Sequence, residues 1–219
     1  MAIVDFAHRE IIASVVYFGP PGSGTSSNVR YLYDHLEVEE KSPIHHFASH
    51  NETHESRFFD YMPVAGGSIK GFTSRIRVYS LPGDIRNPTH RDQILRDVDG
   101  LVFVADRRKG RASDNTRYLL ELEASLQEHN IEMARLPLVF QLNHGDTPHA
   151  VDSQALANEL NPYGFKVLDS NALEGTNVLE THHAILEPLV ARIEKGLAGD
   201  TRATRLNTVH HGSREKAED

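Results

Sequence analysis

The sequence predicts an α/β fold in which one mixed, mostly parallel sheet of six strands carries helices on both faces. Apolar, strand-sized segments alternate with amphipathic helical segments, and a glycine-rich loop joins the first strand to the first helix. Gly66-Gly67 lies between two consecutive strands and predicts an antiparallel hairpin at one edge. Alternating strands and helices favour parallel pairing, and ligand-binding loops then gather at the carboxyl ends of the strands.

The individual elements follow from hydrophobic periodicity and from turn residues. The segments expected as strands are residues 11–18, 57–64, 72–79, 101–105, 136–142 and 165–168. The segments expected as helices are residues 28–36, 114–129, 153–160 and 178–197. Beyond residue 198 the apolar content falls and charges dominate. We therefore expect a single domain over residues 1–199 and a disordered tail over residues 200–219.

Composition argues against several classes of protein. The chain has 23 basic and 31 acidic residues and a net charge of −8, which disfavours binding to nucleic acid. It has no cysteine, so disulfides, thiolate metal sites and cysteine lipidation are excluded, and Ala2 offers no myristoylation site. The side chains of adjacent histidines such as His182 and His183 point apart and do not predict a metal site. We expect a protein of the bacterial cytoplasm without a membrane anchor.

A phosphate-binding loop is predicted at residues 19–26, between the first strand and the first helix. Its glycine spacing is that of a Walker A loop, in which backbone N–H groups and a helix N-terminus cradle phosphates. The predicted phosphate contacts are Gly19, Gly22, Ser23, Gly24, Thr25, Ser26 and Ser27. A glycine turn in another doubly wound protein is the alternative interpretation.

Two features of this loop predict weakened nucleotide binding. Thr25 stands where the Walker motif has lysine, and Pro21 contributes no N–H donor. A lost charge-assisted hydrogen bond costs on the order of 1.5–3 kcal/mol, or roughly one to two decades of affinity. The hydroxyl of Ser26 is suited either to bind Mg²⁺ or simply to cap the helix.

A base-reading segment is predicted at Asn143-His144-Gly145-Asp146, directly after a buried strand. A carboxylate such as Asp146 can accept from both N–H groups on the edge of guanine, whereas adenine presents an acceptor there. The ring of His144 can cover one face of the base. The end of the next strand supplies further predicted contacts, at Ser170, Asn171 and Ala172. Turn formation by an Asn-x-x-Asp pattern is the simpler alternative.

Longer stretches resemble the MglA family of bacterial Ras-like GTPases, over roughly residues 10–195. They are YFGP at residues 17–20, RFFDYMP at 57–63, RIRVYSLPG at 75–83 and VDGLVFVAD at 98–106. The resemblance implies a Ras-like P-loop G domain that binds GDP or GTP with Mg²⁺. It also implies a switch in gliding motility or cell polarity, with a roadblock-fold, MglB-like or polarity-protein partner, and possible recruitment of the chain to a cell pole.

The same resemblance locates the catalytic positions. Ser56 falls on the switch threonine and keeps a hydroxyl for Mg²⁺, whereas Glu55 replaces the arginine that precedes it. Gly83 ends the family's variant of the Asp-x-x-Gly motif, and Asp84 falls on the catalytic glutamine. Phosphoryl transfer depends on positioning and on cationic stabilisation, so these changes predict slow or absent hydrolysis.

Two alternatives to a slow nucleotide switch remain open. One is a nucleotide-free scaffold. The other is an active GTPase in which Lys70, Arg30, Arg57 or a partner's arginine supplies the missing charge.

Overall fold

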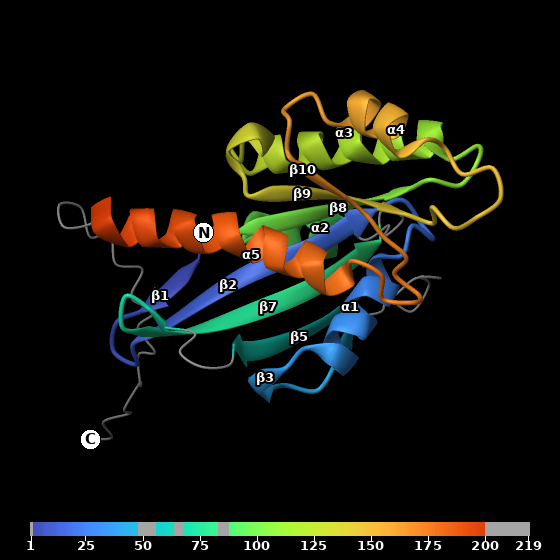
Figure 1. Ribbon diagram of the computed structural model, residues 1–219. Helices are drawn as coiled ribbons and strands as arrows, with labels where there is room; N and C mark the ends of the chain where they lie inside the picture. The colour runs from blue at the N-terminus through green and yellow to red at the C-terminus, as the bar shows by residue number, and fades with distance from the viewer. Residues whose placement is uncertain (1, 48–55, 64–67, 83–87, 200–219) are drawn as a thin grey trace, which may run out of the picture.

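A computed structural model of the 219-residue chain describes residues 2–47, 56–63, 68–82 and 88–199. In these residues one sheet runs through the molecule in the order β10-β9-β8-β2-β7-β5-β3, with three short strands added to it (Figure 1). The strands are β1 (Ile3–Asp5), β2 (Glu10–Gly19), β3 (Val38–Lys41), β4 (His45–Phe47), β5 (Ser56–Pro63), β6 (Ser68–Ile69), β7 (Phe72–Pro82), β8 (Gly100–Asp106), β9 (Leu138–Asn143) and β10 (Lys166–Asp169). The α-helices are α1 (Thr25–His35), α2 (Pro88–Arg96), α3 (Ala112–Glu128), α4 (Ser153–Leu160) and α5 (Val178–Gly199).

The sheet is mostly parallel, as predicted. β2 pairs in parallel with β7 and β8, and the parallel order continues through β9 to β10. β5 is antiparallel to β7 and forms the predicted mixed edge. The α/β fold is therefore confirmed, although the sheet has more strands than the six predicted.

Two apolar layers cover the two faces of the sheet. Side chains of α1 and α5 pack on one face with Val15 and Val102, whereas side chains of α2, α3 and α4 pack on the other face with Val16 and Leu101. Neighbouring residues of β2 and β8 thus enter opposite layers, because successive strand side chains point to opposite faces. Both strands lie in the centre of the sheet and are buried on both sides, which explains their continuous apolar sequence.

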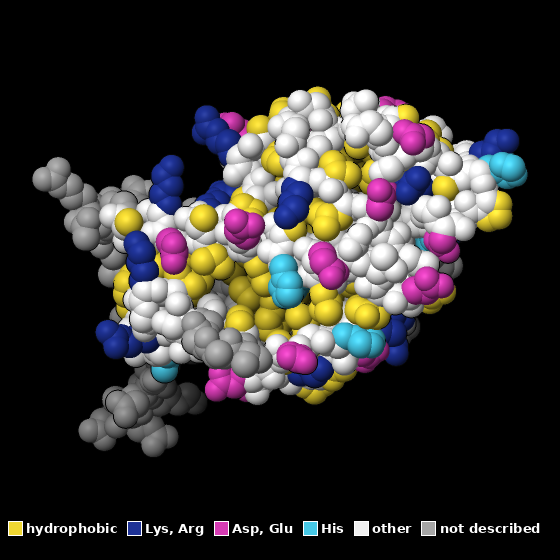
Figure 2. All heavy atoms as spheres, in the orientation of Figure 1, with side chains coloured by type: hydrophobic (Ala, Val, Ile, Leu, Met, Phe, Trp, Pro, Cys, Tyr) yellow, Lys and Arg dark blue, Asp and Glu magenta, His cyan; other side chains and the backbone are white. Residues whose placement is uncertain are grey.

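The layer under α1 and α5 is partly visible from outside. Figure 2 shows hydrophobic side chains in a hollow below α5 and beside α1. Partly buried side chains of this layer include Tyr33 of α1, Leu36 directly after it, and Leu186 and Val190 of α5.

The two strands predicted to form a hairpin, β5 and β7, pair antiparallel, and the short strand β6 between them forms a tight hairpin with β7. β6 and β7 are joined through Lys70 and Gly71, which have φ angles of 50° and 83°. Both residues occupy the left-handed region that a tight hairpin turn of this kind requires. Gly66 and Gly67 lie outside the described residues.

The remaining differences concern elements with a weak apolar pattern. α2 was not predicted, because its sequence is polar except for Ile94 and Leu95 near its end. β3 is exposed at three of its four positions and contains Glu39, Glu40 and Lys41. The predicted disordered tail, residues 200–219, lies outside the described residues. Within the described residues, no helix combines the length and the apolar character that a membrane crossing requires.

Candidate nucleotide-binding site

The predicted phosphate loop and base-reading segment lie at the same edge of the sheet. Gly19 at the end of β2 is paired with Pro82 of β7, and Asp106 of β8 is paired with Asn143 of β9. β10 ends beside them at Asp169, opposite the penultimate residue of β9. The carboxyl ends of these five strands therefore form one continuous edge, which is where ligands bind in open α/β sheets.

The phosphate loop approaches this edge so closely that two positions require glycine. A Cβ atom on Gly19 would overlap with the carbonyl oxygen of Val104, and one on Gly24 would overlap with the side chain of Asn143. Gly22 and Gly24 also have φ angles of 76° and 108°, which L side chains rarely adopt. The glycines thus leave a backbone cradle that side chains would fill.

The start of α1 makes this cradle suited to an anion. Gly24 is the N-cap, Thr25, Ser26 and Ser27 form the first turn, and no acidic residue lies in that turn. The first N–H groups of a helix have no acceptor within the helix, and its dipole is positive at this end. The hydroxyl of Ser23 is buried and has no hydrogen-bond partner among the described residues, so it too is available as a donor. These groups fit a nucleotide phosphate.

Asn143 connects the two halves of the candidate site. Its Nδ2 donates to the carbonyl oxygen of Ser23 at 2.7 Å, and its Oδ1 accepts from the backbone N–H of Ala172 at 3.0 Å. The hydroxyl of Ser170 lies 3.5 Å from the same oxygen. Asn143 is 1% exposed, so its described contacts join the three loops to one another.

The rest of the base-reading segment faces outward. Nε2 of His144 lies 3.1 Å from the carbonyl oxygen of Gly22. Asp146 is exposed, and its carboxylate has no hydrogen bond to the described residues, so both oxygens can accept from a ligand. The side-chain oxygen of Asn171 accepts from the N–H groups of Leu173 and Glu174 and therefore shapes its own turn.

The predicted Mg²⁺ ligands are only partly described. The hydroxyl of Ser26 lies 3.5 Å from that of Ser80, which is fully buried and accepts from the N–H of Arg57 at 3.0 Å. Ser56 belongs to β5, next to this pair, but its side chain lies outside the described residues, as do Gly83 and Asp84. In the described part of the chain, no group of three or more acidic or histidine side chains is arranged to hold a metal ion. A hydroxyl-lined Mg²⁺ site would draw its other ligands from phosphate and water.

The cations proposed to replace the Walker lysine lie in different places. Lys70 sits at the far end of β7 and donates to the carbonyl oxygen of Glu194. Arg30 is exposed on α1. Arg57 is close to Ser80, and its Nε is buried without a hydrogen-bond partner among the described residues.

Arginines after β8 also contact the site, and they match no motif. Arg108 donates to the carbonyl oxygen of Gly22 at 3.0 Å, and Arg111 donates to that of Pro21 at 2.7 Å. Arg107 donates to Asp169 and lies against Gly145, where a Cβ atom would overlap with it. The only signal in the sequence is the cluster of arginines directly after a buried strand.

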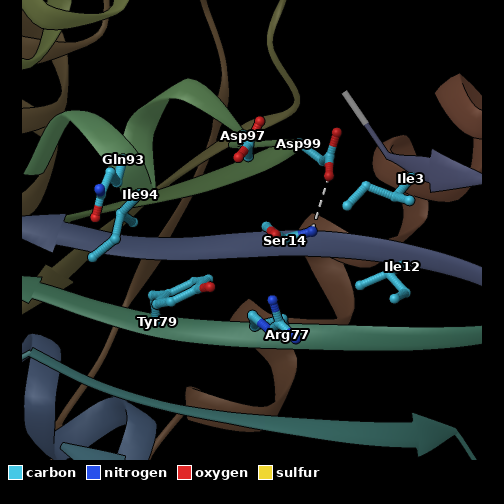
Figure 3. Close-up of a pocket in the computed structure, with 9 residues that line it drawn as sticks. All are labelled: Ile3, Ile12, Ser14, Arg77, Tyr79, Gln93, Ile94, Asp97 and Asp99. Atoms are coloured by element: carbon cyan, nitrogen blue, oxygen red, sulfur yellow. Dashed lines mark hydrogen bonds between the residues drawn. The ribbon is translucent and has the colours of Figure 1, made fainter. Parts of the chain in front are cut away.

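A separate pocket of about 70 Å³ lies farther back along β2 (Figure 3). It is lined by Ile3, Ile12, Ser14, Arg77, Tyr79, Gln93, Ile94, Asp97 and Asp99. Asp99 accepts from the N–H of Ser14 at 2.9 Å, and burial raises the pKa of its carboxyl. Small-molecule sites usually have about 300–1,000 Å³, so this pocket is too small for a nucleotide.

The fold and the candidate site define the class of this protein as a Ras-like G domain. No family model matches the chain. The chain is 32% identical over 196 residues to the mutual gliding-motility protein MglA of Myxococcus xanthus. The aligned region covers 90% of this chain and 100% of that protein. The chain therefore belongs to the MglA family of Ras-like small GTPases.

Proposed function

We propose that this protein binds guanine nucleotide and acts as a switch in cell polarity or motility, with weak or absent hydrolysis. The observation that carries the proposal is the pair of hydrogen bonds that Asn143 forms, one donated to the carbonyl oxygen of Ser23 and one accepted from the N–H of Ala172. They hold the phosphate loop and the base-reading segment together at one edge of the sheet. The name of the Myxococcus relative supports a role in gliding motility.

The groups available at this edge favour GDP and GTP over other nucleotides. The backbone of residues 22–26 would hold the phosphates, and the exposed carboxylate of Asp146 would accept from both N–H groups of guanine. The hydroxyls of Ser26 and Ser56 would contact a Mg²⁺ ion bound with the nucleotide. Bound Mg²⁺ would supply charge stabilisation to the phosphates.

Weak hydrolysis is proposed from the residues at three positions. Thr25 cannot supply the charge of a lysine, Glu55 reverses the charge of an arginine, and Asp84 is anionic where a glutamine orients water. Each change opposes the cationic stabilisation on which phosphoryl transfer depends. Arg57 provides the competing interpretation, because its backbone N–H donates to Ser80 and its buried Nε has no hydrogen-bond partner among the described residues.

Binding and hydrolysis require separate tests on the full chain. Titration with fluorescent GDP, GTP and ATP, with and without Mg²⁺, should give binding to the two guanine nucleotides and much weaker binding to ATP. Absence of GDP binding at high micromolar concentration would leave the nucleotide-free scaffold. Phosphate release under single-turnover conditions should be very slow, and a rate typical of small GTPases would refute the pseudo-GTPase proposal.

The proposed partners and location come from the family. We propose a roadblock-fold, MglB-like or polarity-protein partner that binds the nucleotide-loaded protein in the cytoplasm of a bacterial cell. Recovery of such a partner with GTP-loaded but not GDP-loaded protein would support a switch. Equal recovery in both states would favour a scaffold.

A further inference from the structure

We propose that Arg108 and Arg111 are positioning residues that hold the phosphate loop in a phosphate-accepting shape. They brace the loop from outside, in a protein that lacks the Walker lysine. This inference rests on the proposed binding of guanine nucleotide. Both arginines lie between β8 and the start of α3, beside the loop but outside its motif.

The two arginines share one buried anchor, the carboxylate of Asp106 at the end of β8. Nη2 of Arg108 lies 2.6 Å from Oδ2 of Asp106, and Nε of Arg111 lies 3.2 Å from the same oxygen. The side chain of Asp106 is 0% exposed. Burial alone would raise the pKa of Asp106, but hydrogen bonds from Arg108 outweigh it, and the pKa is lower than usual. The anchor is therefore a carboxylate at neutral pH.

The backbone of the anchor is itself fixed. Asn115 of α3 accepts from the N–H of Asp106 at 2.9 Å and donates to its carbonyl oxygen at 2.8 Å. Asn115 is fully buried, so neither hydrogen bond competes with solvent. The arginines thus extend from a rigid base.

From this base each arginine holds one carbonyl of the phosphate loop. Arg111 donates to Pro21 at 2.7 Å, and Arg108 donates to Gly22 at 3.0 Å. In a trans peptide the C=O and the following N–H point in opposite directions. The hydrogen bond to Pro21 therefore turns the N–H of Gly22 away from Arg111, toward the inside of the loop.

The direction of this N–H is important because the loop has few donors. Pro20 and Pro21 have no N–H, and the N–H of Ser23 already donates to the carbonyl oxygen of Pro20 at 3.0 Å. The N–H of Gly22 is thus the first donor after Gly19 that the loop can offer to a phosphate. Thr25 is buried and too short to reach across the loop as a lysine does. Arg108 and Arg111 instead fix the loop through hydrogen bonds to its backbone carbonyl oxygens.

The test compares GDP and guanosine binding in full-length variants. R108Q and R111Q should each weaken GDP binding about ten-fold, since each loses one charge-assisted hydrogen bond. Guanosine has no phosphate, so its affinity, measured by ligand-observed NMR, should not change. The ³¹P resonances of bound GDP should shift in both variants. R108K and R111K should recover part of the GDP affinity, because lysine can still donate to a carbonyl.

Arg117, in the following helix α3, provides a matched control. It pairs with Asp114 at 3.2 Å, is 58% exposed and has no described contact with the phosphate loop. R117Q should leave both affinities unchanged. GDP affinities of R108Q and R111Q equal to that of R117Q would overturn the inference. Parallel loss of guanosine and GDP binding would also overturn it, as a general structural effect. Failure of the unaltered protein to bind GDP would instead refute the proposed function.

Discussion

The hydroxyl of Tyr61 on β5 and Nε2 of His182 on α5 lie 2.7 Å apart in the core. Nδ1 of the same ring lies 3.2 Å from the hydroxyl of Tyr17 on β2. A neutral imidazole can accept from one tyrosine and donate to the other, so both ring nitrogens are satisfied. His182 is fully buried, and burial, together with the charge of His183, lowers its pKa to about 3.

This arrangement predicts that the stability of the fold decreases as the pH falls from about 6.5 to about 3. The folded pKa lies below the unfolded value near 6.5, so the unfolded chain binds the proton first and stability falls as pH falls. The free energy of unfolding should drop by up to about 1.4 kcal/mol per pH unit in this window. Urea unfolding across this range, for the unaltered protein and for H182Q, measures the effect. Glutamine can bond to both tyrosines but does not titrate. Equal pH slopes in the two proteins would show that His182 does not contribute.

A second prediction concerns Gly24. G24A places a Cβ against Asn143 in a backbone with φ of 108°, and it should destabilise the fold by about 2 kcal/mol or more and abolish GDP binding. G71A is the matched control, because Gly71 has φ of 83° but no atom within 4 Å of an added Cβ. It should cost roughly 1–2 kcal/mol and leave binding intact. Thermal unfolding and fluorescent GDP titration measure both effects, and GDP binding by G24A would contradict the proposed closeness of the loops.

A third prediction concerns the connection made by Asn143. N143A should lower the free energy of unfolding by about 2–4 kcal/mol, because the buried groups on Ser23 and Ala172 each lose a partner. It should also weaken GDP and guanosine binding together, since both halves of the site lose their common support. N158A removes an exposed asparagine of α4 that pairs with Gln154, and should change neither quantity. Binding by N143A equal to that of N158A would contradict the structural role assigned to Asn143.

A fourth prediction concerns base selectivity. D146N replaces an acceptor-only side chain with one that also donates, so it should bind xanthine, which carries an oxygen where guanine has an amino group. GDP affinity should fall at least ten-fold, because charge-assisted hydrogen bonds contribute about 1.5–3 kcal/mol. Competition of xanthosine diphosphate with fluorescent GDP measures the exchange of preference. Unchanged selectivity would remove Asp146 from the base site.

Local sequence patterns were sufficient to predict the central strands, the glycine loop and the common edge. The strands β2 and β8 were predictable because their side chains are apolar on both faces of the sheet. The glycine loop was predictable because Gly19 and Gly24 occupy positions where a side chain would overlap with neighbouring atoms. The tight turn at Lys70 and Gly71 was not predicted, because its first positive φ belongs to a lysine, which carries no turn pattern in the sequence.

The contacts of Arg108 and Arg111 were beyond sequence patterns for a different reason. They join residues 86 and 90 positions apart, and their acceptors are backbone carbonyls, which every residue has. No choice of residue type at Pro21 or Gly22 signals such a bond. Long-range hydrogen bonds to the main chain become visible only when the fold is known.

Pro20 and Pro21 have a consequence for the kinetics of ligand exchange. Proline restricts φ in the unbound chain as well as in the bound one, which saves roughly 0.4–1 kcal/mol of ordering entropy at each compatible position. The vacant and filled loops should therefore share nearly one conformation. A preorganised loop of this kind binds its ligand without first rearranging. A low nucleotide affinity would therefore reflect a high dissociation rate constant rather than a low association rate constant.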